Sequence, residues 1–150
     1  MFTEERIKET EQNWRGYLSD NLVRKESFRQ VVFDTFVRNH LESLKVAESV
    51  STQNLSFLWT IVVSYYSMFY LANAIIYKVG YKVGDKLAHK ITADALIILV
   101  RNKLKSSLLA EYEEAQSEAL EIAKNKADML IDSFDKERDK RSYFQYETTE

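Results

Sequence analysis

His89 is the side chain of this sequence best placed for acid–base or phosphate chemistry, because Lys90 follows it and the apolar pattern of a helix starts there. The first turn of a helix offers free backbone N–H groups and a partial positive charge, which suit a phosphate group. A neutral imidazole in this place can also act as a base. The alternative is that His89 forms a hydrogen bond to a neighbouring helix and fixes the loop before it.

A row of aromatic side chains lies upstream in residues 64–80, and three polar members of it share one helical face. Tyr66, Tyr70 and Asn73 follow one another at spacings of four and three residues. Such an edge can stack a base or line a nucleotide cleft. The alternative is ordinary core packing, in which the tyrosine hydroxyls reach the backbone or water at the surface of the protein.

A basic cluster near the end of the chain is the third place where a nucleic acid could bind. Arg138 and Arg141 stand close to Tyr143, and arginines beside aromatic rings suit contacts to an RNA backbone and its bases. Acidic residues alternate with these cations. A solvated helix with ion pairs such as Glu137–Arg141 is therefore the alternative interpretation.

Several other chemistries have no signature in this chain. It has no cysteine, which excludes disulfides, thiolate zinc sites and cysteine nucleophiles. The two histidines lie far apart and form no His-x-x-His or Glu-x-x-His motif, so we predict no metal site and no cofactor. The glycines in residues 79–84 lack the spacing of a phosphate-binding loop. The net charge is −2, so a nucleic acid would have to bind a local basic patch.

The elements that must position these residues are predicted to be long helices, because the chain has no proline and only three glycines. We predict a helix over residues 3–19 with Thr3 as its N-cap, a polar joint over 20–26, and a helix over 27–50. Further helices are predicted up to Gly80 as the C′ residue, over 87–105 and over 109–143. No alternating pattern flanked by turn residues predicts a strand. Apolar residues are expected to give the helix over 27–50 one core-facing side: Phe28, Val31, Val32, Phe36, Leu41, Leu44 and Ala47.

Residues 49–77 carry no charged side chain, and such a stretch is long enough to span a bilayer. However, it contains many serine, threonine, asparagine and tyrosine side chains, whose polar groups would need partners in lipid. A helix that is apolar all round can equally be the central helix of a bundle. We therefore expect no membrane span. The acidic, polar N-terminus does not resemble a signal peptide, and the lack of cysteine fits a reducing interior, so we expect a cytoplasmic protein.

Residues 64–80 and 89–97 together resemble a signature of compact prokaryotic HEPN proteins. The resemblance covers about residues 40–145 and leaves residues 1–24 outside it as a helical extension of a single domain with a core over 27–145. In the last helix, Arg138 and Tyr143 match the family, whereas Arg141 and Ser142 depart from its pattern. The earlier matching positions are Tyr65, Tyr66, Phe69, Ala72, Ala74, Gly80, His89 and Lys90.

The resemblance implies an all-α, up-and-down bundle of four core helices, here with an extra N-terminal helix, which usually forms a homodimer. It also implies binding of nucleotide or RNA and, in many members, a toxin–antitoxin pair with a minimal nucleotidyltransferase. Active HEPN ribonucleases use an arginine followed four to six residues later by a histidine. His40 and His89 have no arginine at that distance, since Arg38 is only two residues from His40.

Three hypotheses follow from the sequence. The first is a HEPN-type dimer that binds nucleotide or RNA, which requires an open groove lined by Lys90, Arg138 and tyrosines. The second is an assembly module, in which those residues are used in contacts within the chain and the largest exposed feature is apolar. The third is a ribonuclease of a different kind, in which His89 and Arg138 meet in one cleft.

Overall fold

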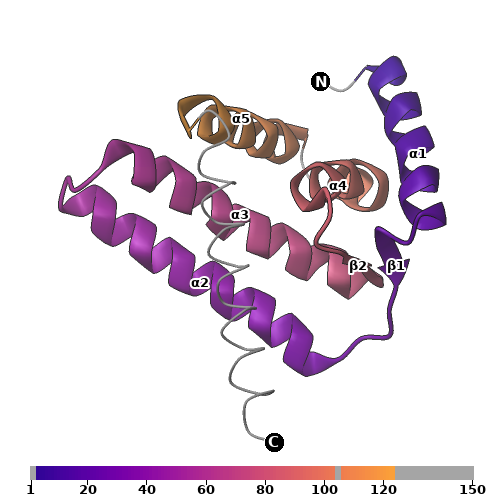
Figure 1. Cartoon of the computed structure of the whole chain (residues 1–150), viewed down its shortest axis with the longest axis horizontal. Helices are drawn as coiled ribbons and strands as arrows, with labels where there is room; N and C mark the ends of the chain where they lie inside the picture. Colours follow the sequence, from indigo (N-terminus) through magenta and orange to yellow (C-terminus); the bar gives the residue numbers. More distant parts are fainter. Residues whose placement is uncertain (1–2, 104–105, 124–150) are drawn as a thin grey trace, which may run out of the picture.

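In the computed structural model, residues 3–103 and 106–123 are described, and they form five α-helices and one two-stranded antiparallel sheet (Figure 1). The prediction of an all-α helical bundle is confirmed. The α-helices and strands occur in the order α1 (Glu4–Ser19), β1 (Val23–Lys25), α2 (Gln30–Thr52), α3 (Phe57–Val79), β2 (Tyr81–Val83), α4 (Ala88–Ala95) and α5 (Ser106–Ala123). α4 continues into a π-helical segment, Leu96–Val100, and a 3-10 turn, Arg101–Lys103.

Capping residues set several of the helix ends. Thr3 is the N-cap of α1, as predicted, and its hydroxyl accepts a hydrogen bond from Arg6 N (3.2 Å). Gly80 ends α3 with φ 113°, a left-handed conformation that suits glycine, so the predicted C′ residue is also confirmed. Ser56 caps α3 through Trp59 N (3.2 Å). α2 continues to Thr52, two residues beyond the predicted end of this helix at residue 50.

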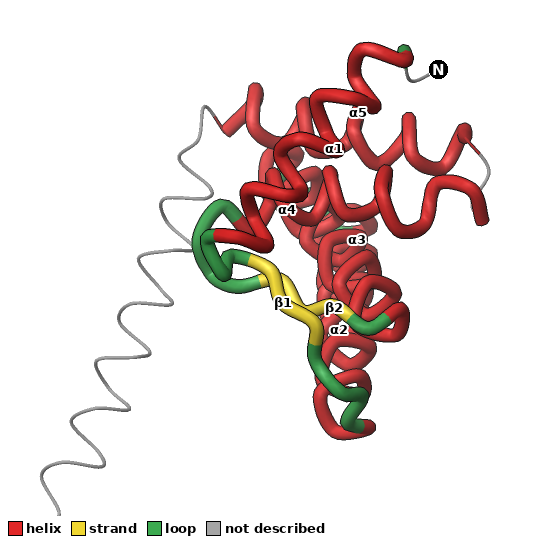
Figure 2. Tube along the Cα trace, turned by 90° about the vertical axis from the view of Figure 1, so that its right-hand side faces the viewer, coloured by secondary structure: helices red, strands yellow, loops and turns green. Residues whose placement is uncertain are grey.

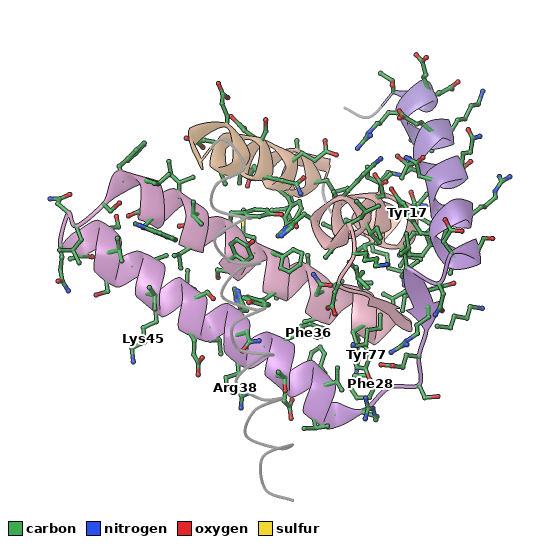
Figure 3. All side chains as sticks on the ribbon, viewed as in Figure 1. Tyr17, Phe28, Phe36, Arg38, Lys45 and Tyr77 are labelled. Carbon is green, nitrogen blue, oxygen red and sulfur yellow. The ribbon has the colours of Figure 1, made fainter. Side chains whose placement is uncertain are left out.

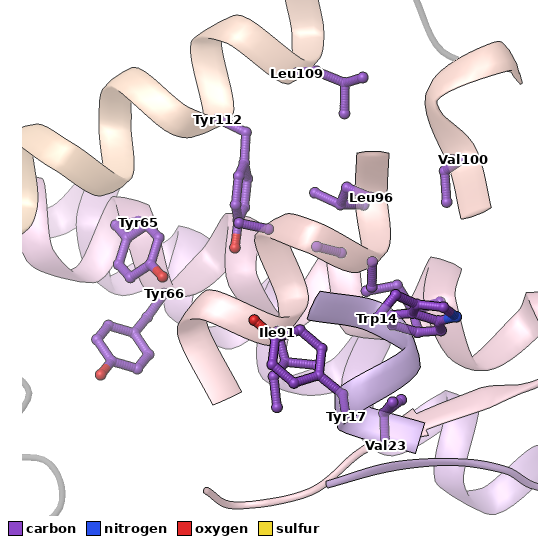
Figure 4. Packing of buried hydrophobic residues seen from close by; sticks show 14 of the residues in the cluster. Trp14, Tyr17, Val23, Tyr65, Tyr66, Ile91, Leu96, Val100, Leu109 and Tyr112 are labelled. Carbon is purple, nitrogen blue, oxygen red and sulfur yellow. The ribbon is translucent and has the colours of Figure 1, made fainter. Parts of the chain in front are cut away.

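α3 lies at the centre of the molecule, with α2 along one side and α4 and α5 on the other (Figure 1). Its side chains Tyr65, Ile76 and Tyr77 are almost completely buried. Every residue from 91 to 97 is also buried, so α4 is enclosed on all sides from its second turn onward. The close-up of the core in Figure 4 shows side chains of α1, α3, α4 and α5 converging around Ile91 and Leu96.

α1 packs against α4 and belongs to the same core. Trp14 and Tyr17 are each 7% exposed. The Tyr17 hydroxyl donates a hydrogen bond to Oδ2 of the buried Asp94 on α4 (2.8 Å), and Arg6 lies 3.5 Å from the other oxygen of that carboxylate. Residues 1–24, set apart as an extension because the resemblance did not cover them, therefore include part of the buried core.

α2 packs mainly on α3, and its expected apolar side is largely exposed. Only Ala47 of this helix is fully buried. The predicted core positions Val31, Leu41 and Leu44 are 67%, 55% and 39% exposed, so that part of the prediction is wrong. The tighter contact lies at the start of the helix, where the rings of Phe28 and Phe36 pack on Tyr77 (Figure 3).

The two strands contradict the prediction that the chain contains none. β1 lies within the expected polar joint, and β2 follows Gly80 directly. Their register pairs Val23 with Val83, Arg24 with Lys82 and Lys25 with Tyr81. Figure 2 shows the strands side by side, linking the end of α1 to the end of α3. Val23 is only 1% exposed and supplies the apolar anchor of this ribbon.

α3 is, among the described residues, the one helix whose length and composition would allow it to cross a membrane, with a mean hydropathy of 1.3 over its best window. Its polar side chains have partners within the bundle. Ser67 Oγ donates to His40 O on α2 (3.0 Å), and Asn73 Nδ2 donates to Thr92 Oγ1 on α4 (3.2 Å). These contacts are what a polar residue in the core helix of a bundle requires.

Candidate functional site

His89 lies in the first turn of α4 between two tyrosines of α3. Its Nδ1 is 2.7 Å from Tyr65 Oη, and its Nε2 is 3.2 Å from Tyr66 Oη. The ring of Phe69 packs on the imidazole with centroids 4.6 Å apart. The residue before the helix, Leu87, has φ 54°, which is uncommon for a leucine. We call Tyr65, Tyr66, Phe69 and His89 the histidine cluster.

Gln116 of α5 closes the histidine cluster from the third side. Its Nε2 donates to Tyr65 Oη (3.1 Å) and to the backbone oxygen of His89 (3.2 Å). Since Tyr65 Oη accepts from Gln116, the hydroxyl proton of Tyr65 is available for His89 Nδ1. In the tautomer of His89 that carries its ring proton on Nε2, this N–H donates a hydrogen bond to Tyr66 Oη. This arrangement forms a continuous row of hydrogen bonds from α5 to Tyr66.

Tyr112 of α5 lies behind this row, with its ring 6.0 Å from that of Tyr65. Its hydroxyl is buried and has no hydrogen-bond partner among the residues described. Burial, reinforced by the neighbouring Tyr65, raises the pKa of Tyr112 above its usual value. The interior around the histidine cluster therefore favours neutral groups.

The three residues that the sequence grouped on one helical face have different surroundings in the structure. Tyr66 and Tyr70 lie with their rings 6.3 Å apart, and Tyr70 is half-buried. Asn73 is buried, and its amide donates to Phe69 O and Thr92 Oγ1, so it serves the α3–α4 contact. Lys90 is exposed beside His89. Of the predicted set, the structure brings Tyr66, Tyr70 and His89 close together, and Lys90 follows His89 in the first turn of α4.

Arg138, Arg141 and Tyr143 lie outside the described residues. The predicted convergence of Arg138 with His89 is therefore still a prediction, and so is the basic cluster at the end of the chain. His40, the second histidine, lies between α2 and α3 with Nδ1 2.9 Å from both Ser67 O and Ser67 Oγ. It links two helices and stands apart from the histidine cluster.

Sequence reasoning missed Gln116 and Tyr112, because both reach the histidine cluster from a helix far along the chain. Their spacing of four residues places them on one face of α5, which is the only local signal they carry. Within residues 3–103 and 106–123, no three acidic or histidine side chains lie close enough together to hold a metal ion.

Comparison with protein-family models, with characterised proteins and with solved structures finds no match to this chain. Its possible function therefore has to be inferred from its own residues. In chemical terms, the histidine cluster can orient an imidazole and pass a proton along hydroxyl groups, and the exposed cation Lys90 follows it in the chain.

Proposed function

We propose that this protein is a HEPN-type nucleotide- or RNA-binding protein without the usual arginine–histidine ribonuclease motif. The observation that carries the proposal is the histidine cluster, in which Tyr65 and Tyr66 hold both nitrogens of His89 beside the exposed Lys90. The cation of Lys90 in the first turn of a helix suits a phosphate, and the aromatic rings of the cluster suit a base. Both ring nitrogens of His89 are engaged by tyrosines, which favours recognition through Lys90 over proton transfer between the imidazole and a ligand.

The same proposal includes a cytoplasmic location and a minimal nucleotidyltransferase as partner in a toxin–antitoxin-like pair. Both rest on the resemblance of residues 64–80 and 89–97 to HEPN proteins. In such a pair, the chain would be either a toxin that has lost the usual catalytic pair or a pure binding subunit.

The experiment that tests RNA binding uses labelled RNA in excess chelator and follows binding and cleavage in the same tubes. Lys90→Gln removes the cation beside His89, and Tyr66→Phe removes one hydroxyl of the histidine cluster. Lys45→Gln on α2 is the matched control, because Lys45 is also exposed and lies on a different helix (Figure 3). We expect Lys90→Gln to weaken binding severalfold and the control to leave it unchanged.

Two outcomes decide against the proposal. Equal RNA affinity of Lys90→Gln, Tyr66→Phe and wild type would mean that the RNA binds elsewhere on the protein or binds without specificity. RNA cleavage lost in Tyr66→Phe or His89→Ala would replace the proposal by the third hypothesis, a metal-independent ribonuclease of a different kind.

A second candidate function, assembly, is favoured by the apolar side chains at the α2–α3 turn. Half of the exposed large apolar residues of the described chain fall between residues 41 and 59. We call the following residues the hairpin apolar surface: Leu41, Leu44, Leu55, Phe57, Leu58 and Trp59. Exposed apolar groups gathered in this way mark protein–protein contacts.

We infer that a second copy of this chain covers the hairpin apolar surface and gives the expected homodimer. Residues 49–77 contain no charged side chain, so the part of the contact formed by Leu55, Phe57, Leu58 and Trp59 would bury no unpaired ion of its own segment. The same surface on each copy can be its own partner. Light scattering at two concentrations should give a dimer. Leu55→Gln with Phe57→Gln should give a monomer, whereas Leu18→Gln with Val31→Gln, also exposed, should stay dimeric. A monomeric wild type, or lipid-vesicle binding that the first pair abolishes, would contradict the inference.

A further inference from the structure

The β1–β2 ribbon places two cations opposite each other. Arg24 of β1 is the register partner of Lys82 of β2. Residues directly opposite in an antiparallel pair point to the same face of the sheet, with Cβ atoms about 4.5–5.5 Å apart. Val23, Val83, Lys25 and Tyr81 point to the other face, where Val23 is buried. The outer face of this short ribbon is therefore cationic.

Such a pair destabilises a ladder, because like charges in direct opposition repel each other. Arg24 is partly neutralised by Glu26, the residue that follows β1, at 3.3 Å, in an exposed contact that contributes little. Lys82 makes no ion pair within the described part of the chain. The repulsion between Arg24 and Lys82 is therefore only partly compensated.

A hollow of about 200 Å³ opens beside this pair, large enough for a phosphate group. Backbone groups form part of its wall, since Gly84 N donates to Leu22 O (2.9 Å) across the base of the ribbon. A Cβ on residue 84 would lie 3.0 Å from Leu22 O, so any side chain there would press on the Leu22 backbone, and glycine allows the close approach beside the hollow. Asp85 is the one acidic residue of its lining, which consists of the following residues: Asn21, Leu22, Arg24, Lys82, Val83, Gly84 and Asp85.

We propose that the outer face of the ribbon, through Arg24 and Lys82, binds phosphate groups of a single-stranded RNA backbone. The choice of RNA as the source of the phosphate rests on the proposed function, whereas the phosphate site follows from the cation pair and the hollow. An anion between the two side chains would remove their repulsion and use both charges at once. The ribbon would position the RNA without reading its sequence, as phosphate contacts do.

The first test measures RNA affinity across a range of salt concentrations for wild type and Arg24→Gln/Lys82→Gln. Losing two phosphate contacts to a single strand lowers the slope of log affinity against log salt by about 1.4. Arg38→Gln/Lys45→Gln is the matched control, since it removes two exposed cations of α2, and should leave the slope unchanged (Figure 3).

Lys82→Glu separates a binding site from a structural role. It places a carboxylate opposite Arg24, which should raise the melting temperature by about 1–4 °C while RNA binding falls. A lower melting temperature together with unchanged binding would overturn the proposal, because the cation pair would then serve only the fold.

A titration with pyrophosphate, followed through the amide signals of Leu22 and Gly84, tests the site without RNA. Shifts that disappear in Arg24→Gln/Lys82→Gln support the phosphate site even if wild type binds no RNA, in which case the proposed function alone fails. No shift at either amide and an unchanged salt slope would overturn the site. Weaker RNA binding in Lys90→Gln but not in the ribbon variant would also overturn it and leave the proposed function standing.

Discussion

α1 and α2 are both amphipathic helices at the edge of the protein, but they bury very different shares of their apolar residues. α1 places Trp14 and Tyr17 in the core and contacts α4 and the π-helical segment behind it. α2 is longer and richer in apolar residues, yet only Ala47 is fully buried. The difference lies in the neighbours, since α1 meets an enclosed helix while α2 packs mainly on α3.

This contrast shows that the strength of an apolar pattern does not determine how deeply a helix is buried. A side chain on α1 enters a space bounded by three other elements, whereas one on α2 has a neighbour on one side only within the described part of the chain. Burial contributes in proportion to the apolar area removed from water. α2 therefore gains less stability per apolar residue within the single chain, and its remaining apolar surface is available for another molecule.

The largest expected effect on stability comes from shortening a buried side chain of α1. Trp14→Ala should lower the free energy of unfolding by about 3–5 kcal/mol, because it leaves a cavity beside α4. Leu41→Ala on α2, at 55% exposure in the single chain, should change it by no more than about 0.5 kcal/mol at protein concentrations low enough to keep the chain monomeric. Urea unfolding followed by circular dichroism measures both values.

The same pair of variants also tests whether the hairpin apolar surface is covered. A large loss for Leu41→Ala that grows with protein concentration would mean that a second copy buries this residue. A large loss independent of concentration would mean that the contrast between the two helices is wrong for the whole chain.

The contrast also marks how far the sequence could predict the fold. Local signals were sufficient for the cap at Thr3, the left-handed Gly80 and the apolar α3, because each depends on neighbours within a few residues. The exposure of Leu41 and Leu44 could not be predicted, since periodicity identifies an apolar face but not what covers it. β1, which spans Val23–Lys25, is too short to show alternation.

The candidate site was predictable to a similar extent. His89, Lys90 and the tyrosines of α3 could be selected by residue type and spacing. The contacts of His89 with Tyr65, Tyr66 and Gln116 depend on how three helices meet, and no spacing in the sequence encodes that meeting.

High pH should lower the free energy of unfolding, because α1 and α5 each bury a tyrosine whose pKa is raised. Burial, together with the hydrogen bond to Asp94, raises the pKa of Tyr17, and burial raises that of Tyr112. Both tyrosines stay protonated in the folded state while the unfolded chain loses these protons near its ordinary value of 10.0. Stability is therefore complete below that pH and falls above it, by about 1.4 kcal/mol per pH unit for each tyrosine.

Unfolding free energies measured between about pH 9 and pH 11 check this slope against the ordinary tyrosine range. Tyr17→Phe should reduce the slope, although it also removes the hydrogen bond to Asp94 and lowers stability at neutral pH. An unchanged slope in Tyr17→Phe with Tyr112→Phe would mean that neither buried hydroxyl causes the alkaline loss.

The smallest expected effect tests the contact that holds α2 on α3. Ser67 is 2% exposed, and its hydroxyl donates to His40 O (3.0 Å) and lies 2.9 Å from His40 Nδ1. Ser67→Ala should cost about 1 kcal/mol, because the Ser67 backbone oxygen still partners the imidazole. Ser64→Ala is the matched control, since Ser64 Oγ bonds only within α3, to Thr60 O. Amide exchange should quicken in α2 for Ser67→Ala and not for Ser64→Ala. Equal exchange in both variants would show that apolar contacts at Phe36 and Tyr77 hold α2 without the His40–Ser67 link.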